Sequence, residues 1–303
     1  MLCRPGFHTS GQVPSSGLHA SAYPGTVAVR RDLPLIAAAA CLVGLVVVGV
    51  LALYVPAAHE RDAAMLHGFM ALDQPSVGSE IRVLAHLGDM LPYALGGLVC
   101  VVVALARGRG WRALAVAALF VATGVTTQVL KHLLAEPRLQ DWLKWRQIDA
   151  TSWPSGHSTA MMTLALCAVL VAPPVLRTAA VVLGGALAVG VGYALLVLGW
   201  HYPSDVLGGY LVAGLWTSLA VAALHRVEEP EPARRLEWGP LIALGAGCAV
   251  VAAVAVGVRT HTVALYALER PTFVAGALTI PLLALALVAT VSAASTRGAP
   301  RAR

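Results

Sequence analysis

Charged residues are scarce in this sequence. Aspartate, glutamate, lysine and arginine make up 12% of its 303 residues, whereas 58% of the residues are hydrophobic. A soluble domain typically has about 25% charged residues and about 45–50% apolar ones. The shortage of charge therefore excludes an ordinary soluble protein and predicts a membrane protein that crosses the bilayer several times.

Motifs for metal or nucleic-acid binding are also missing. The cysteines show no CxxC or other metal-like spacing, which predicts small buried hydrophobic residues. They are Cys3, Cys41, Cys100, Cys167 and Cys248. The net charge of +6 is not gathered into a basic block with interleaved aromatic residues, so it gives no support for a nucleic-acid partner.

Eight apolar stretches are candidates for membrane spans, because about 20 apolar residues cross the hydrocarbon core. They are 33–55, 90–107, 111–131, 157–175, 177–199, 206–225, 239–258 and 272–292. The first is longer than the apolar region of a cleavable signal, about 7–15 residues, which predicts a retained anchor. Residues 1–32 are predicted to be a disordered cytoplasmic segment and residues 226–238 a cytoplasmic linker, followed by a C-terminal extension, 239–303.

Arginine placement sets the expected orientation, because basic residues gather in cytoplasmic loops. With the N-terminus inside, the arginines on the cytoplasmic side are Arg30, Arg31, Arg107, Arg109, Arg112, Arg177, Arg226, Arg234, Arg235, Arg297, Arg301 and Arg303. The opposite face then receives residues 56–89, 132–156, 200–205 and 259–271. Three polar clusters lie on this outer face, each at the edge of an apolar stretch.

The first polar cluster consists of Lys131 and Arg138. Pro137 is expected to stop the third apolar helix, which leaves Lys131 on the helix and Arg138 on the following loop. Two cations at this position are typical of side chains that snorkel to the membrane interface. They also suit the binding of an anion.

The second polar cluster consists of Pro154, Ser155, Gly156 and His157. Ser155 directly before an apolar stretch predicts a helix N-cap. The free N–H groups of a helix start bind anions, and Gly156 would let an anion approach closely. His157 in the first turn would reach a bound group and donate a proton to it, although a lone histidine at this place is often structural.

The third polar cluster runs from His201 to Asp205. Pro203 suits the first turn of the sixth apolar helix, and a helix start favours Asp205 even without a function. His201 and Asp205 are four residues apart, so the carboxylate can bond one ring nitrogen and leave the other as a nucleophile. Three such clusters on one face favour a phosphate site over three independent structural roles.

These clusters resemble the three motifs of the type 2 phosphatidic acid phosphatase family, K-x6-R-P, P-S-G-H and S-R-x5-H-x3-D. Lys131 and Arg138 match the first motif, residues 154–157 match the second in full, and His201 with Asp205 match the end of the third. The resemblance covers roughly residues 60–225. It implies an all-α integral membrane protein with a six-span phosphatidic acid phosphatase-type core, 33–225. The last two apolar stretches lie outside the resemblance and are expected to add two C-terminal spans.

The resemblance also implies roles for these residues. His201 would attack phosphorus and carry a phospho-histidine intermediate, Asp205 would orient it, and His157 would protonate the leaving oxygen. The residues implied to hold the phosphate oxygens are Lys131, Arg138, Ser155 and Gly156. The mechanism implied is independent of metal and uses no cofactor.

Two of the three motifs depart from the family pattern. Leu139 stands where the first motif has proline, with Pro137 before the arginine instead. In the third motif, Ala194 and Leu195 stand where serine and arginine are expected. Since that arginine would help to bind phosphate, either another cation replaces it, or the substrate differs, or activity is weak. The candidate replacements are Arg82, Lys144 and Arg146.

We therefore expect a multi-pass cell-membrane lipid phosphatase with its active site on the extracytoplasmic side. Its substrate would be phosphatidate, phosphatidylglycerol phosphate or a polyprenyl phosphate or diphosphate. The alternative is a phosphotransferase or a low-activity lipid-phosphate binder, because of Leu195. A transporter is disfavoured, since no charged residue lies near the middle of a predicted span and no inverted repeat is evident. The expected partners are the substrate and membrane lipids; the sequence leaves the lipid and the oligomeric state open.

Overall fold

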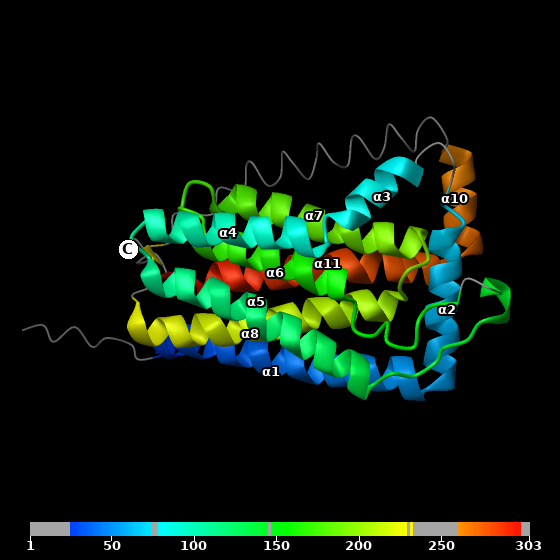
Figure 1. Ribbon diagram of the computed structural model, residues 1–303, viewed down its shortest axis with the longest axis horizontal. Helices are drawn as coiled ribbons and strands as arrows, with labels where there is room; N and C mark the ends of the chain where they lie inside the picture. The colour runs from blue at the N-terminus through cyan, green and yellow to red at the C-terminus, as the bar shows by residue number, and fades with distance from the viewer. Residues whose placement is uncertain (1–24, 74–77, 145–146, 229–230, 233–259, 298–303) are drawn as a thin grey trace, which may run out of the picture.

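The chain folds into a bundle of helices (Figure 1). The computed structural model describes residues 25–73, 78–144, 147–228, 231–232 and 260–297. Its helices are α1 (Gly25–Tyr54), α2 (Pro56–Met70), α3 (Gly78–His86), α4 (Met90–Ala106), α5 (Gly110–Leu133), the 3₁₀ turn η1 (Asp141–Leu143), α6 (Gly156–Val171), α7 (Arg177–Val197), α8 (Pro203–Val227), α10 (Thr260–Glu269) and α11 (Pro271–Ala294). Two short strands, β1 (Glu231–Pro232) and β2 (Thr296–Arg297), pair in parallel. Apart from this pairing, the expected helical fold is confirmed for the described residues.

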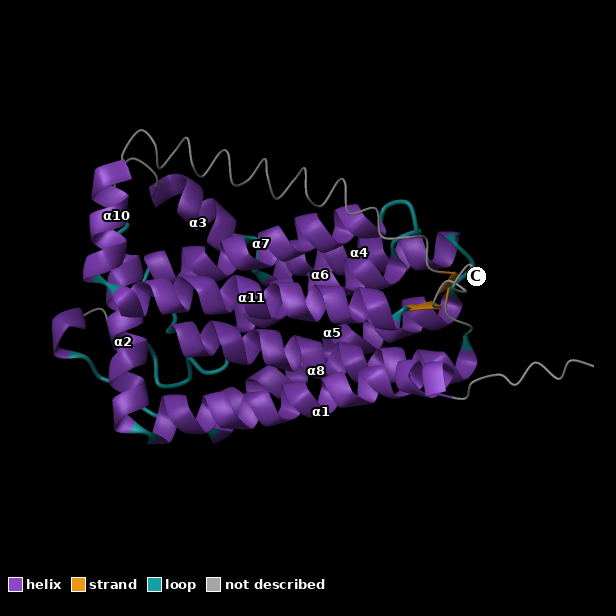
Figure 2. Cartoon of the chain, turned by 180° about the vertical axis from the view of Figure 1, so that it is seen from behind, coloured by secondary structure: helices purple, strands orange, loops and turns teal. Residues whose placement is uncertain are grey.

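Most helices run along one long axis, and two run across it. Figure 1 shows α1, α4, α5, α6, α7, α8 and α11 along the bundle, with α2 and α10 across one end. Figure 2 shows the same arrangement from behind. Helix α2 begins directly after α1 with Pro56 in its first turn, where a residue without an N–H group costs no hydrogen bond. Its Asp62 contacts Ser204 at the start of α8, so α2 covers the end of the bundle that holds the third polar cluster.

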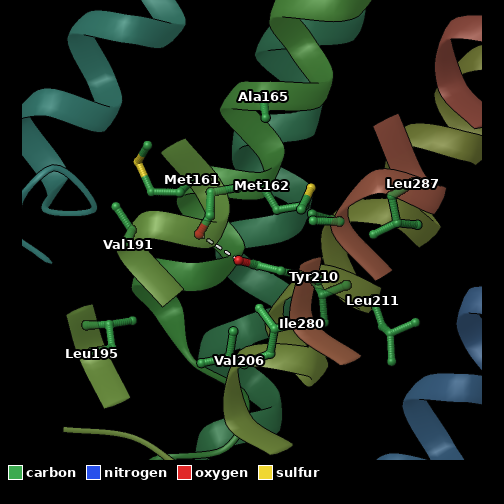
Figure 3. Packing of buried hydrophobic residues seen from close by; sticks show 14 of the residues in the cluster. Met161, Met162, Ala165, Val191, Leu195, Val206, Tyr210, Leu211, Ile280 and Leu287 are labelled. Atoms are coloured by element: carbon green, nitrogen blue, oxygen red, sulfur yellow. Dashed lines mark hydrogen bonds between the residues drawn. The ribbon is translucent and has the colours of Figure 1, made fainter. Parts of the chain in front are cut away.

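Helix α6 lies at the centre of the bundle. It packs against α4, α5, α7, α8 and α11, and most of its residues are buried. A helix that is apolar on all sides is expected to be enclosed by other helices. Figure 3 shows side chains of α6 and its neighbours in this core, among them Met161, Met162, Ala165, Val191, Leu195, Val206 and Tyr210. The Tyr210 hydroxyl donates a hydrogen bond of 2.6 Å to the Ala188 carbonyl, so even this polar group is satisfied inside the core.

The described residues contain five helices that are long and apolar enough to cross a membrane, or six if α3 and α4 form one span bent by 53°. Helix α6 was expected to be a full span, but it is shorter, with 16 residues. The expected span 239–258 lies outside the described residues. Helix α11 packs against α2, α6, α7 and α8, so this part of the C-terminal extension joins the core. The integral membrane fold is thus supported, while the expected eight spans are not all seen.

Arginines gather at the end of the bundle opposite the polar clusters. Arg107 Nη1 donates to the Val171 carbonyl at 2.7 Å, and Arg112 Nη1 donates to the Leu170 carbonyl at 2.9 Å. These carbonyls belong to the last turn of α6, where a helix leaves acceptors unsatisfied and favours cations. Arg112 Nε also donates to Glu228 Oε2 at 3.1 Å, beyond the end of α8. The bundle therefore has one arginine-rich end and one end that carries the polar clusters.

A close approach between α6 and α8 brings the second and third polar clusters together. A Cβ atom at Gly209 of α8 would lie 2.7 Å from the Ser155 carbonyl oxygen and 2.9 Å from the Thr159 amide nitrogen. Both atoms are backbone and cannot rotate away. Only glycine allows α8 to lie so close to the first turn of α6.

The variant Gly209→Ala should therefore destabilise the protein by about 1–3 kcal/mol, the usual cost of overpacking a core. We expect a lower midpoint of thermal unfolding in detergent. Gly124→Ala is the matched control, because Gly124 lies within α5 with no atom within 4 Å of the added Cβ. In this control the free energy of unfolding should be unchanged or higher by up to about 1 kcal/mol, since alanine has a higher helix propensity than glycine. Equal midpoints for the two variants would show that the contact is not tight.

Candidate active site

The three polar clusters meet at one end of the bundle, at the buried residue Asp205. The carboxylate of Asp205 forms an ion pair with Arg138 Nη2, which brings the first and third clusters together. The backbone carbonyl of Asp205 accepts a hydrogen bond of 2.9 Å from the Ser155 amide, which adds the second cluster. Asp205 has no exposed surface. Residues that are far apart in the sequence thus share one site.

The turn between α7 and α8 places His201. Gly199 ends α7 in the left-handed conformation, with φ of 68°, which favours glycine. The amides of Gly199 and Trp200 donate to the carbonyls of Leu196 and Leu195 at 3.1 and 2.9 Å, the pattern of a Schellman motif. These two bonds satisfy backbone carbonyls at the end of α7. His201 follows this turn directly and lies two residues before the start of α8.

His201 and Asp205 form a bonded pair. His201 Nδ1 lies 3.2 Å from Asp205 Oδ2, and the same oxygen accepts a hydrogen bond of 2.9 Å from the Tyr202 amide. A carboxylate only accepts hydrogen bonds, so His201 carries its proton on Nδ1 when the ring is neutral. The lone pair of Nε2 is then free for attack on a substrate.

The second cluster forms the first turn of α6. Ser155 caps the helix, since its Oγ accepts a hydrogen bond of 3.3 Å from the Ser158 amide, and its side chain is fully buried. No atom lies within 4 Å of a Cβ built on Gly156, so there is open space beside its backbone. His157 is partly exposed, and its ring centroid lies 6.4 Å from that of His201. The two histidines are therefore placed to act on one small group between them.

Lys131 and Arg138 have different environments, although both were expected to bind phosphate. Lys131, in the last turn of α5, has no ion-pair or hydrogen-bond partner among the residues that the structure describes, and it lies within electrostatic range of Asp205 and Asp149. Its ammonium group is thus available to a ligand. Arg138 is buried, and Nη1 and Nη2 donate to Ser204 Oγ at 3.1 Å and to Ser152 Oγ at 2.7 Å.

Arg138 therefore acts as an internal counter-ion in this structure. Besides its ion pair with Asp205, its guanidinium stacks 4.1 Å above the centre of the Tyr202 ring. The Tyr202 hydroxyl in turn donates to the Arg138 carbonyl at 2.7 Å. Burial opposes the charged form of Arg138, but the charge and the hydrogen bond of Asp205 together with the charge of Asp62 outweigh it, so the pKa of Arg138 lies above its ordinary value.

Asp62 of α2 is a member of this network that the sequence motifs do not reveal. Its Oδ1 accepts a hydrogen bond of 3.0 Å from the Ser204 amide, and its Oδ2 lies 3.5 Å from Arg138 Nη1. Burial raises the pKa of Asp62 to about 6, because loss of solvent outweighs the bonds from Ser204 and the charge of Arg138. No motif spacing connects Asp62 to the clusters, so only the three-dimensional fold identifies it.

The arginine missing from the third motif has no evident replacement in the described residues. Leu195 is fully buried in the hydrophobic core, where Figure 3 shows it on α7. Of the three candidate replacements, Arg82 and Lys144 are exposed, and Arg146 lies outside the described residues. The site consequently has fewer free cations than the family motifs imply.

An apolar groove of about 430 Å³ lies between α5 and α8, but far from these residues. It is lined by the first half of α5 and the last half of α8, from Trp111 to Ala122 and from Trp216 to Val227. These segments lie towards the arginine-rich end. With almost no polar lining, the groove suits lipid chains and offers no group for phosphate chemistry.

Comparisons with known proteins support a phosphatase-type fold. Residues 111–229 match the family model of the PAP2 superfamily. Among solved structures, the chain is similar to one described as the first transmembrane PAP2 type phosphatidylglycerolphosphate phosphatase from Bacillus subtilis. That match has a TM-score of 0.51 and 18% sequence identity, and it covers 65% of this chain and 98% of that chain. A comparison with curated proteins finds no match. The resemblance drawn from the motifs is confirmed, and the structural likeness shows a shared fold.

Because Arg138 is enclosed by two carboxylates, Arg138→Ala should destabilise the protein by about 3–5 kcal/mol, the cost of leaving buried charges without a partner. We expect a marked fall in the thermal midpoint in detergent, whereas Arg82→Ala, at an exposed position, should change it little. The double variant Arg138→Ala/Asp62→Asn should recover part of the loss, because one orphaned carboxylate is removed. A double variant as unstable as Arg138→Ala alone would rule out Asp62 as a counter-ion of Arg138.

Proposed function

We propose that this chain is a membrane lipid phosphatase that hydrolyses a phosphomonoester or diphosphate of a lipid through a phospho-histidine intermediate. The observation that carries the proposal is the His201–Asp205 pair, which lies opposite His157 at the start of two helices. The match of residues 111–229 to the PAP2 superfamily supports phosphatase activity for this arrangement. The candidate substrates are phosphatidate, phosphatidylglycerol phosphate and a polyprenyl phosphate or diphosphate.

The proposed reaction has two steps. In the first, the Nε2 lone pair of His201 attacks phosphorus, the bond from phosphorus to the lipid oxygen breaks, and His157 gives its proton to that oxygen. In the second, water attacks the phospho-histidine, passes a proton back to His157, and releases phosphate from His201. Asp205 holds His201 in the reactive tautomer throughout, as the third member of a catalytic triad does.

Charge stabilisation would come from the groups around the open space beside Gly156. The backbone amides at the start of α6 point towards this end of the bundle, and a helix N-terminus favours an anion. Lys131 supplies a cation without a competing partner in the described part of the chain. Such preorganised donors are often the largest contribution to phosphoryl transfer. The proposed reaction needs no metal ion for these roles.

The proposed active site faces the extracytoplasmic side of the cell membrane. The support is the separation of charges along the bundle, since Arg107, Arg109 and Arg112 lie near the end of α6 and α8 that is opposite the clusters. Basic residues favour the cytoplasmic side, which directs the other end outward.

A second candidate function is phosphotransfer to an acceptor other than water, or binding of a lipid phosphate with little turnover. The observation that favours it is the weakened phosphate clamp, because Leu195 is buried and Arg138 is engaged by Asp205 and Asp62. In a phosphotransferase, the first step would be retained and the phosphoryl group would leave His201 for a lipid or sugar hydroxyl.

The decisive measurement is phosphate release by detergent-purified protein from the lipid phosphates named above, with EDTA present. His201→Ala should abolish release, and His157→Ala should reduce it by about 100-fold or more, the usual contribution of a general acid. His132→Ala serves as the control, because His132 is exposed and bonds only the Gln128 carbonyl in the described structure. With ³²P-labelled lipid, the protein should carry an acid-labile label that is absent from His201→Ala.

The outcomes separate the candidates. Labelling without phosphate release would favour the phosphotransferase, and lipid binding without labelling would favour the binding protein. A wild-type protein as inactive as both histidine variants on every lipid would refute the hydrolase.

A further inference from the structure

His157 has a carboxylate partner that lies outside the three polar clusters. His157 Nε2 lies 2.9 Å from Oδ1 of Asp89, the residue directly before α4. The other carboxylate oxygen, Oδ2, lies 2.9 Å from His86 Nδ1 at the end of α3. Since a carboxylate only accepts hydrogen bonds, both histidines donate to Asp89. His157 therefore has its own histidine–carboxylate pair, separate from that of His201 and Asp205.

The usual structural role of Asp89 is not fulfilled. Aspartate directly before a helix normally caps it by accepting a backbone N–H bond. Asp89 occupies the N-cap of α4, yet its side chain makes no capping bond to that helix. Both of its oxygens are directed to His157 and His86 instead. The missing capping bond is the first indication that the Asp89 carboxylate has a role other than capping α4.

The break between α3 and α4 is also packed directly onto His157. The two helices bend by 53° at this point. A Cβ atom at Gly88 would lie 2.8 Å from Cβ of His157 and 3.1 Å from its Cα, so glycine is needed for the contact. This close approach fixes the backbone of Asp89 relative to His157, which makes the bond a feature of the fold.

We propose that Asp89 is the positioning carboxylate of His157, and that His86 holds the second oxygen of Asp89 in place. This inference rests on the proposed function, in which His157 is the general acid. The side chains of these three residues lie close to water, with an exposure of 30% for His157, 45% for Asp89 and 55% for His86. His201, by contrast, is 10% exposed on its side chain.

The two ring nitrogens of His157 have different roles in this proposal. Asp89 holds the proton on Nε2 of His157, so Nδ1 is the atom that gives a proton to the leaving lipid oxygen and later takes one from water. The negative charge of Asp89 favours the charged imidazolium that the first step requires. Burial of the ring is the strongest effect that opposes this positive charge, His201 and Lys131 oppose it as well, and His86 acts through Asp89. Asp89 is thus the one of these groups that favours the imidazolium directly.

The test compares Asp89→Asn with Glu80→Gln in the full-length protein in detergent. Glu80 is an exposed acid of α3 that bonds only its neighbour Ser79 in the described structure, and it lies outside the proposed site. The probes are phosphatidylglycerol phosphate, whose alkoxide leaving group needs a proton, and p-nitrophenyl phosphate, whose phenolate does not. Both kinetic constants are measured from pH 5 to pH 9.

Asp89→Asn should lower kcat for the lipid by about 10-fold or more with little change in KM, because only part of the ~100-fold or greater contribution of a general acid is lost. The alkaline limb of its pH profile should move to lower pH, since an uncharged partner no longer favours the imidazolium. The rate of the p-nitrophenol burst should be nearly unchanged, and Glu80→Gln should match the wild type. Equal loss on both substrates, or an unshifted profile, would overturn the proposal.

A second readout does not depend on turnover. In protein with ¹⁵N-labelled histidine, the imidazole resonances of His157 are assigned by their loss in His157→Gln. The Nε2–H tautomer of His157 should be seen in the wild type, and its titration midpoint should be lower in Asp89→Asn. If the wild type cleaves no lipid but the midpoint shifts, the proposed function fails and the pairing stands. An unchanged midpoint would refute the pairing whether or not the protein is active.

Discussion

The burial of one carboxylate, that of Asp205, is the constraint on which the site depends. An ionised carboxylate without solvent contact is stable only when hydrogen bonds and opposite charges replace the water. Here the Tyr202 amide, the His201 ring and the Arg138 guanidinium provide this replacement. The His201 ring and the Tyr202 amide belong to the turn before α8, and Arg138 belongs to the loop after α5. The need to satisfy one charge thus brings His201, the loop that carries Arg138 and the start of α8 into a fixed arrangement.

The same constraint explains why Arg138 is not an open phosphate ligand in this structure. With Asp205 and Asp62 both buried beside it, its guanidinium is the local counter-charge for two acids. A phosphate would have to compete with these carboxylates for the same N–H groups. Lys131 has no such competitors among the described residues. In the proposed site, the electrostatic contact with a substrate would therefore fall on Lys131 and on the helix start at Gly156, rather than on the full set of cations that the motifs imply.

Sequence patterns predicted the parts of this site that depend on neighbours along the chain. The cap by Ser155, the start of α8 at Pro203 and the bond between His201 and Asp205 all follow from residues within four positions of each other. Asp62 and Asp89 could not be predicted in this way. Their partners lie 142 and 68 residues away, and neither acid belongs to a periodic or capping pattern that marks a function. Both also lie outside residues 111–229, the segment that matches the PAP2 superfamily.

His201 and His157, which have opposite tasks in the proposed reaction, lie in different surroundings. A nucleophile must keep a free lone pair, which suits His201, because buried Asp205 accepts a hydrogen bond from its Nδ1–H group and Arg138 already balances the negative charge of that carboxylate. The proposed general acid, His157, must carry a positive charge before it gives up its proton, and Asp89 favours this charge because the carboxylate has no arginine counter-charge among the described ion pairs. Environments that differ between two titratable groups are the usual sign of an acid and a nucleophile in one site. In the proposed reaction, the two carboxylates, more than the two histidines, would therefore determine which ring attacks phosphorus and which delivers the proton.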